Sequence, residues 1–222
     1  MFCRFCSSLA CAPDGESPHK SHSLQKMSTI ILKYPAGNIF SVKSALNHLG
    51  EECVITDDVQ QLRAASHIII PGQGEAAITM DYLRKTGLDK VIISLQCPVL
   101  GICIGMQLMC ESSEEGDAKC LGIFPGVKVA RFRPQSGEKI PQMGWNNIRS
   151  LSSPLFDGVP DGSYVYFVHS YYAPLCSYTI AQTDFCGLYS ASLHKDNFYA
   201  VQFHPEKSGD TGLHILDNFL KL

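Results

Sequence analysis

The chain has 222 residues, of which 45% are hydrophobic and 18% are charged, so it is long enough for one domain with a complete core and too apolar for a disordered chain. The formal net charge of −3 gives no electrostatic reason to expect nucleic acid or an anionic membrane as a partner. No apolar run approaches the roughly 20 residues that a membrane-spanning helix needs.

The first 26 residues, MFCRFCSSLACAPDGESPHKSHSLQK, show neither helix nor strand periodicity. We interpret residues 1–26 as a disordered extension, or as the product of an upstream start codon with Met27 as the ancestral start. Three cysteines in a loose C-x2-C-x4-C leave a metal or redox role open, although no second pair of ligands follows at zinc-finger spacing. An arginine interrupts the short apolar portion, which makes a secretory signal a poor match.

From residue 28 onward, strand-like and helix-like segments alternate. β-branched apolar runs predict strands, and runs with a 3.6-residue apolar period predict helices. The predicted strands are 28–34, 52–56, 66–70, 91–95 and 98–102, and the predicted helices are 38–50, 75–87 and 104–113. Strands separated by helices of this length indicate βαβ units, in which helices cover both faces of a parallel sheet.

After residue 120 the segments are mostly strand-like, with Pro, Gly and Asp between them. The predicted strands here are 127–132, 145–150, 164–170, 177–182, 187–193 and 198–203, followed by an amphipathic helix at 209–222. Strands in such succession suggest antiparallel additions to the sheet. The sequence therefore predicts a single α/β domain over residues 27–222, with an open, mixed, mainly parallel sheet of flavodoxin-like type.

Ten cysteines are many for a chain of this length and could suggest a disulfide scaffold. Several of them, including Cys53, Cys97, Cys110 and Cys120, lie inside apolar segments. Buried free thiols in a reducing compartment account for this pattern better than disulfides do. We therefore expect a cytoplasmic protein, with the disulfide scaffold as the alternative.

One cysteine lies between two glycines where a predicted strand meets a predicted helix. In Gly101-Ile102-Cys103-Ile104-Gly105 the pattern is that of a nucleophile elbow, in which side chains two residues before and after the nucleophile would clash. Such a turn exposes the thiol at the carboxyl end of the sheet, beside free N–H groups that favour a thiolate. The N–H of Ile104 then points to where an oxyanion would form. The alternative is a small core cysteine with accidental glycines.

A nucleophilic cysteine needs a base, and the segment YAVQFHPEKSG supplies the best candidate. His204 follows an apolar strand, and Glu206 lies two residues on, so both face the same side of an extended segment. The histidine can accept the Cys103 proton while the carboxylate orients the imidazole. His169 also ends a predicted strand but has no carboxylate nearby, so we interpret it as a binding or positioning residue.

The loop PGQGEA follows the predicted strand 66–70 directly. Two glycines at such a place allow backbone N–H groups to turn toward a ligand, and together with Ile104 they would form an oxyanion hole. An ordinary strand-to-helix turn is the alternative. The loop lacks the lysine and Ser/Thr of a phosphate-binding loop. We find no grouping with metal-ligand spacing in the sequence and expect no metal and no cofactor.

Taken together in chain order, these pieces resemble the class I (triad) glutamine amidotransferases, and within them the glutaminase subunits of imidazole glycerol phosphate synthase in histidine biosynthesis. The resemblance covers nearly everything from Ser28 to the C-terminus. It is carried by PGQGEA with DYLRKTGL, GICIGMQLMCESSEEG, LGIFPGVKVARF, PQMGWNNI, YFVHSYY and QFHPEKSG. The elbow and HPE are shared by all triad amidotransferases, whereas PQMGWN and YFVHSYY are far more specific to this subunit.

The resemblance implies roles for individual residues. Cys103 would be the nucleophile, His204 the general base and acid, and Glu206 the orienting carboxylate. The residues implied to bind glutamine are Gln107, Ser170 and Tyr171. The loop implied to reorganise and complete the oxyanion hole comprises Gly72, Gln73 and Gly74.

The resemblance also implies a function and a partner. The chain would hydrolyse glutamine and pass ammonia to a (β/α)8-barrel cyclase subunit, which would make imidazole glycerol phosphate and an aminoimidazole carboxamide ribonucleotide. Two departures stand out: Lys33 replaces a usual acidic residue, and Gln73 replaces a small aliphatic residue in the loop. The alternatives are an amidotransferase subunit for anthranilate or pyridoxal phosphate synthesis, or a catalytically silent scaffold subunit.

Overall fold

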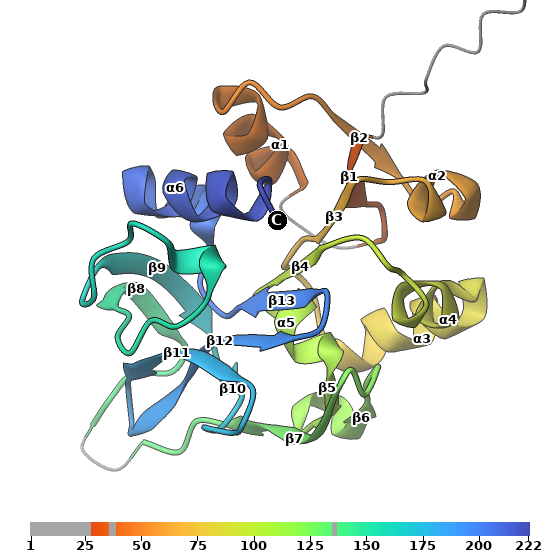
Figure 1. Ribbon diagram of the computed structural model, residues 1–222. Coiled ribbons are helices and arrows are strands. Elements are labelled where there is room, and N and C mark those ends of the chain that lie inside the picture. Colours follow the sequence, from red (N-terminus) through yellow and green to blue (C-terminus); the bar gives the residue numbers. More distant parts are fainter. Residues whose placement is uncertain (1–27, 36–38, 135–136) are drawn as a thin grey trace, which may run out of the picture.

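A seven-stranded sheet forms the centre of the molecule, which we describe from a computed structural model for residues 28–35, 39–134 and 137–222 (Figure 1). The prediction of a disordered segment at 1–26 lies outside these residues. The strand order is β11-β12-β13-β4-β3-β1-β2. Their bounds are β1 Thr29–Leu32, β2 Cys53–Thr56, β3 His67–Ile70, β4 Val99–Ile102, β11 Thr179–Asp184, β12 Leu188–Lys195 and β13 Phe198–Val201.

The pairing of these strands confirms the predicted mixed, mainly parallel sheet. The five strands from β2 to β13 are parallel neighbours, whereas β12 and β11 are added antiparallel at one edge. β1 and β3 are short apolar runs, TIIL and HIII, of the kind expected where both faces of a sheet are buried. The carboxyl ends of β3, β4 and β13 lie side by side at one end of the sheet. Polar side chains from segments far apart in the sequence converge there.

Helices cover both faces of the sheet, as predicted (Figure 1). Along β1, Ile30 packs on one side and Ile31 on the other, because successive side chains of a strand point to opposite faces. One face packs against α2 Val59–Arg63, α3 Ala76–Thr86, α4 Leu88–Ile93 and α5 Ile104–Met109. The other packs against α1 Ile39–His48 and α6 Gly209–Phe219.

Two smaller sheets complete the fold. One contains β5 Cys110–Ser113, β6 Ala118–Lys119, β7 Phe124–Arg131 and β10 Tyr171–Tyr172, in the order β10-β7-β5-β6. The other is an antiparallel pair of β8 Gln142–Asn147 and β9 Tyr164–His169. Within the described residues, the 3₁₀ turn η1 Glu115–Asp117 joins β5 to β6, η2 Pro154–Phe156 joins β8 to β9, and η3 Pro205–Lys207 joins β13 to α6.

The predicted strand at 91–95 is wrong, because these residues belong largely to the short helix α4. Gly87 adopts a left-handed conformation (φ 75°), which ends α3 and lets α4 begin at once. Val91 and Ile92 are buried while Ile93 is half exposed, a one-sided burial suited to a surface helix. A short apolar run does not by itself distinguish strand from helix.

The predicted helix at 104–113 is correct only in its first half. α5 ends at Met109, and the residues from Cys110 to Ser113 form β5 instead. β5 pairs with both β6 and β7, so the hydrogen bonds of this segment go to neighbouring strands. Tertiary pairing overrides the helical periodicity of the sequence here.

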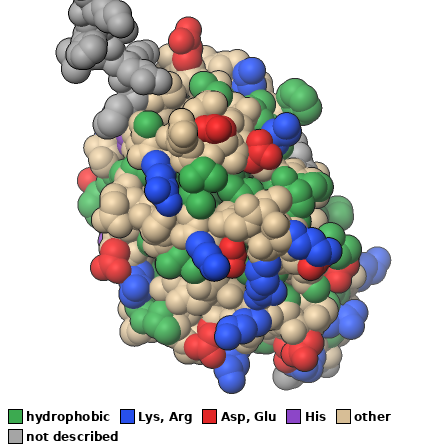
Figure 2. All heavy atoms as spheres, turned by 90° about the vertical axis from the view of Figure 1, so that its right-hand side faces the viewer, with side chains coloured by type: hydrophobic (Ala, Val, Ile, Leu, Met, Phe, Trp, Pro, Cys, Tyr) green, Lys and Arg blue, Asp and Glu red, His purple; other side chains and the backbone are tan. Residues whose placement is uncertain are grey.

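The surface that carries α2, α3 and α4 mixes charge of both signs (Figure 2). One ion pair on this surface joins Lys85 to Asp81 along α3. Another, between Arg133 and Glu114, lies beside β7. The seven described cysteines are free thiols, as predicted, but of the four expected to be buried only Cys110 and Cys120 are, whereas Cys53 and Cys97 are partly exposed. Among the described residues, no helix combines the length and apolar character that crossing a bilayer requires.

Candidate active site

Cys103 occupies a sharp turn between β4 and α5. β4 ends at Ile102 and α5 begins at Ile104, which leaves a single residue to reverse the chain direction. The backbone of Cys103 has φ 52° and ψ −107°, a region that residues with a side chain rarely adopt. Such strain at a reactive residue is the geometry that the G-x-C-x-G pattern predicts.

The two flanking glycines are required by close backbone contacts. A Cβ atom on Gly101 would lie 2.8 Å from the carbonyl carbon of Gly105. One on Gly105 would lie 2.5 Å from the carbonyl oxygen of Ile70, at the end of β3. No real Cβ approaches backbone atoms this closely, so both positions demand glycine, and the predicted crowding at the elbow is confirmed.

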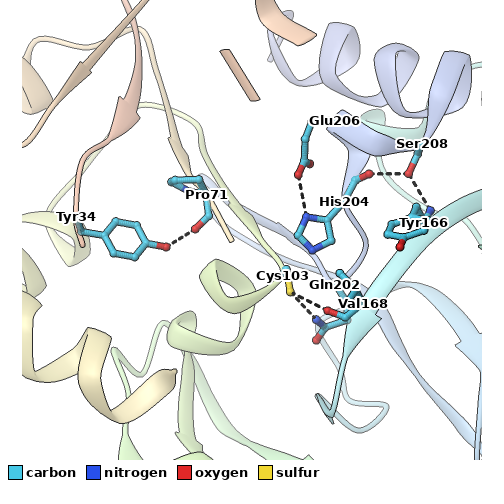
Figure 3. A network of polar contacts seen from close by, with 9 residues as sticks. All are labelled: Tyr34, Pro71, Cys103, Tyr166, Val168, Gln202, His204, Glu206 and Ser208. Atoms are coloured by element: carbon cyan, nitrogen blue, oxygen red, sulfur yellow. Dashed lines mark hydrogen bonds and ion pairs between the residues drawn. The ribbon is translucent and has the colours of Figure 1, made fainter. Parts of the chain in front are cut away.

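His204 reaches the thiol from the strand beside β4. β13 is parallel to β4, with Val201 opposite Ile102, and the N–H of Cys103 donates to the Val201 carbonyl at 2.8 Å. The chain then continues to His204, whose side chain is 1% exposed. Figure 3 shows the imidazole between Cys103 and Glu206. The structure therefore brings the three residues together in the predicted order.

Glu206 engages the far side of the imidazole. Its Oε1 lies 2.8 Å from Nδ1 of His204, and its side chain is equally buried. Nε2 of His204 is buried and, among the described residues, has no hydrogen-bond partner of ordinary geometry, which leaves it facing Cys103. This arrangement fixes the ring orientation that a general base needs.

The charged form of His204 is stabilised by its neighbours. Burial lowers the pKa of His204, but Cys103 and Glu206 outweigh burial and together raise that pKa to about 10. At neutral pH the imidazole is therefore charged beside the sulfur, where it can stabilise developing negative charge and later give its proton to a leaving group.

Hydrogen bonds to the main chain hold His204 in place (Figure 3). Its N–H donates to the carbonyl of Tyr166 on β9 at 2.9 Å, and its carbonyl accepts from Ser208 Oγ at 2.7 Å. Ser208 Oγ in turn accepts from the N–H of Tyr166 at 2.9 Å. The histidine is therefore tied to the β8–β9 sheet on both sides.

A pocket of about 230 Å³ opens beside the thiol. Nine of the residues predicted for the site line it: Gly72, Gln73, Gly74, Cys103, Ile104, Gln107, Ser170, Tyr171 and His204. Glu206 is absent from the lining because it lies behind the imidazole. The remaining lining residues are Glu115, Val168 and His169.

The glycine loop after β3 lies directly against the nucleophile. A Cβ on Gly72 would be 2.2 Å from the carbonyl oxygen of Ile102 and 2.7 Å from Cβ of Cys103. Gly74 has φ 128°, a conformation suited to glycine alone. The hydroxyl of the buried Tyr34 donates to the carbonyl of Pro71, at the start of the loop (Figure 3). The loop is close enough to supply amide donors to a reaction at the thiol.

The segment after β9 forms the opposite wall of the pocket. Its carbonyls accept hydrogen bonds from within the protein: Ser170 from the N–H of Phe132 at 3.0 Å, and Tyr171 from Gln107 Nε2 at 3.0 Å. His169 contacts the same Tyr171 carbonyl through Nδ1 at 2.7 Å. Burial lowers the pKa of His169 to about 4, so the ring is neutral and only weakly basic. Its Nε2 contacts the Tyr189 hydroxyl at 3.1 Å, so both ring nitrogens are engaged and His169 positions this wall of the pocket.

Glu115 and Gln202 belong to the site but were missed by the sequence analysis. Glu115 lies on η1, and its Oε2 accepts from the N–H of Ala76 at 2.8 Å. Burial raises the pKa of Glu115. The acidic run after α5 was the available signal, but it does not say which glutamate faces the pocket. Gln202 shares the strand face of His204, two residues earlier, and that spacing was the signal for it.

The described residues contain no group of three His, Cys, Asp or Glu side chains arranged to hold a metal ion. The pocket instead offers a thiol, two imidazoles, one carboxylate, amide groups and backbone N–H groups. This set suits acyl transfer from an amide or ester through a covalent thioester.

Comparison with known proteins places the chain among enzymes of this kind. The family model "Glutamine amidotransferase class-I" matches residues 36–222. "Imidazole glycerol phosphate synthase subunit HisH" of Bacteroides thetaiotaomicron is 56% identical over 197 residues, covering 88% of this chain and 100% of that protein. The protein of the same name from Shewanella sediminis is 42% identical, covering 88% and 91%.

Solved structures agree on the fold. One glutamine amidotransferase structure superimposes with a TM-score of 0.66 at 18% identity, covering 86% of this chain and 98% of that one. A glutamine amidotransferase from Thermotoga maritima gives a TM-score of 0.57 at 17% identity, covering 86% and 81%.

Proposed function

The chain belongs to the class I glutamine amidotransferase family and, within it, to the imidazole glycerol phosphate synthase HisH subunits, and from this membership we propose that its site hydrolyses glutamine to supply ammonia for histidine biosynthesis. The observation that carries the proposal is the alignment of Cys103 and His204 in the wall of a pocket, with Glu206 behind the imidazole. The amidotransferase domain is proposed to span residues 27–222.

The proposed reaction proceeds through a thioester. The thiolate of Cys103 attacks the side-chain amide carbon of glutamine, and the carbonyl oxygen becomes an oxyanion facing the N–H of Ile104 and the loop 72–74. His204 transfers its proton to the leaving nitrogen, which departs as ammonia. Water then attacks the thioester while His204 accepts a proton, releasing glutamate and the thiol. Glu206 keeps the imidazole aligned through both steps.

The polar groups of the pocket suit an amino acid. Both hydrogens of the Gln107 amide nitrogen are engaged, one by the Tyr171 carbonyl at 3.0 Å and one by Gln202 Oε1 at 3.1 Å. The oxygen of Gln107 therefore remains as an acceptor for the α-ammonium group of glutamine. Glu115, the carboxylate among the lining residues, provides the opposite charge. Ser170 and Tyr171 are proposed to contact the α-carboxylate.

A Glu115→Gln variant is expected to raise KM for glutamine roughly 10- to 100-fold, the effect of losing a hydrogen bond to a charged group, with a smaller change in kcat. Glutamine retains an oxygen that can accept from the N–H of Ala76, so the start of α3 keeps its hydrogen bond. Steady-state kinetics of glutamate release measure the effect. Glu114→Gln is the matched control, because the neighbouring Glu114 binds Arg133 outside the pocket; an equal KM change in both variants would contradict the assignment.

The relatives are named as subunits of a synthase, which implies a complex with a partner. We propose that the partner is a (β/α)8-barrel cyclase, which takes up ammonia and releases imidazole glycerol phosphate and an aminoimidazole carboxamide ribonucleotide. β8 exposes Met143 and Trp145, 66% and 57% respectively, and these offer apolar contact area to a docked cyclase. The free thiols suit the cytoplasm, where such a complex is expected.

The proposal is tested by measuring glutamate release with and without the cyclase and its nucleotide ligand. The isolated chain is expected to be nearly inactive, and the loaded complex at least about 10-fold faster, because the oxyanion loop needs the partner to reach its active arrangement. Equal rates in the two states would count against this regulation. Recovery of an anthranilate or pyridoxal phosphate synthase in a pull-down would show that the partner is that synthase and not the cyclase. Failure of a glutamine-mimicking electrophile to label Cys103 would indicate a silent scaffold subunit.

A further inference from the structure

We infer that Gln202 is an additional catalytic residue, whose amide N–H donates to the sulfur of Cys103 and stabilises it as a thiolate. The inference deepens the proposed function and rests on it, because it assigns a partner to the proposed nucleophile. It is carried by three contacts: Gln107 to the Tyr171 carbonyl, Gln107 to Gln202, and Gln202 to Cys103.

The direction of these hydrogen bonds follows from the one between Gln107 and the Tyr171 carbonyl. A main-chain carbonyl can only accept, so the group of Gln107 that lies 3.0 Å from the Tyr171 oxygen has to be the amide nitrogen. The same nitrogen lies 3.1 Å from Gln202, which must therefore present its oxygen there. The nitrogen of Gln202 is left 3.7 Å from Sγ of Cys103. The network thus assigns a donor, and not an acceptor, to the sulfur.

The backbone leaves Gln202 little freedom to point elsewhere. Its side chain is fully buried, and its N–H donates to the carbonyl of Ala191 on β12 at 2.8 Å. The preceding Val201 accepts from the N–H of Cys103 at 2.8 Å, which fixes the separation of the two main chains. A buried amide donor without a partner is costly, and the sulfur is the partner that the structure gives it.

The sulfur of Cys103 contacts both the Val168 carbonyl and the Gln202 amide (Figure 3). The two protonation states of Cys103 use these neighbours differently. As a thiol, Cys103 donates to the carbonyl of Val168, 3.8 Å from Sγ. As a thiolate it has no proton to donate, so that carbonyl no longer attracts it, whereas the N–H of Gln202 interacts more strongly with a negative sulfur than with a neutral one. Gln202 therefore favours the reactive state together with the His204 imidazolium.

The titratable groups around the thiol come from several elements. They are Tyr34 after β1, Glu115 on η1, His169 on β9, Tyr171 on β10, Tyr189 on β12, and His204 and Glu206 after β13. A substitution of Gln202 by an uncharged side chain leaves all of them in place. A change in the pH dependence of thiol reactivity in such a variant therefore reports the amide contact itself.

The test is alkylation of Cys103 by iodoacetamide between pH 5 and 10, followed by mass spectrometry of the peptide that contains it. Gln202→Met keeps a similar length but removes the donor. We expect alkylation at pH 7 to be roughly 10- to 100-fold slower and the midpoint of the profile to move up by about one to two pH units. In the glutaminase assay kcat should fall by a similar factor, with a smaller change in KM.

Two further variants make the outcome decisive. Gln182→Met is the matched control, because Gln182 binds Ser150 from β11 and should leave the alkylation profile unchanged. Gln107→Met keeps Gln202 but removes the group that orients it, so a smaller shift in the same direction is expected; it serves as the test if Gln202→Met does not fold. An unchanged alkylation profile in folded Gln202→Met or Gln107→Met would overturn the inference. Because alkylation needs no glutamine, that result is distinguishable from failure of the proposed function, which would appear as absent glutaminase activity in the unmodified complex.

Discussion

Replacement of Cys103 by alanine is expected to reduce glutamine-dependent synthesis by at least about 10³-fold, because no thioester can form without the sulfur. Alanine has the same backbone limits as cysteine at φ 52°, so the substitution adds no strain to the turn. Synthesis from added ammonium, which bypasses this site, should continue at the unmodified rate. The measurement is product formation by the assembled synthase with glutamine or with ammonium as the nitrogen source.

Comparing the two nitrogen sources separates loss of ammonia production from loss of the synthesis step that uses ammonia. Cys97→Ala is a suitable control, since Cys97 is a half-buried free thiol that does not line the pocket. It should leave both rates unchanged. If Cys103→Ala also abolished synthesis from ammonium, the division of work between this chain and its partner would be wrong.

A Glu206→Gln variant should lose roughly 10²- to 10⁴-fold in kcat, since the carboxylate that aligns His204 is replaced by a neutral amide. It should also lower the pKa of His204, because Glu206 is one of the two groups that raise it to about 10. Rate profiles between pH 6 and 10 check both effects. Asp210→Asn, an exposed carboxylate on the first turn of α6, is the control that should change neither.

The same variant has a consequence for stability. A histidine whose pKa is raised on folding, from 6.5 to about 10, contributes stability that is full below pH 6.5 and disappears as the pH rises through 10. The unmodified chain should therefore lose unfolding free energy between pH 7 and 10. In Glu206→Gln this loss should occur at lower pH. Urea unfolding at a series of pH values checks the shift; coincident curves would show that Glu206 does not stabilise the charged imidazole.

The sequence predicted the parts of the site that depend on local geometry. A nucleophile between glycines and a His-Pro-Glu run each specify a backbone path over a few residues, so Cys103 and His204 were assigned without the fold. Strand 98–102 and strand 198–203 were also recognisable as apolar runs, and the structure places them side by side. That adjacency brings the base to the thiol from a hundred residues away.

What the sequence did not provide depends on contacts between distant segments. Gln202 is one of several glutamines until its amide is seen between Gln107 and Cys103. Glu115 shares an acidic run with Glu114, and the bond to Ala76 distinguishes the residue at the pocket. The residues of β5 were predicted as helix because their apolar period is helical. Their hydrogen bonds go to β6 and β7, and the local period of the sequence says nothing about these distant partners.

The loop beside the nucleophile is fastened at both ends. Tyr34 binds the carbonyl of Pro71 on one side, and Glu115 binds the N–H of Ala76 on the other. Only the four residues 72–75 lie between these two fixed points, and two of them are glycines. A signal from a docked partner would thus need to rotate just one or two peptide planes, leaving both fastenings intact. Activation by such a local rotation carries a small entropic cost, and it can be reversed at every turnover without disturbing the surrounding sheet.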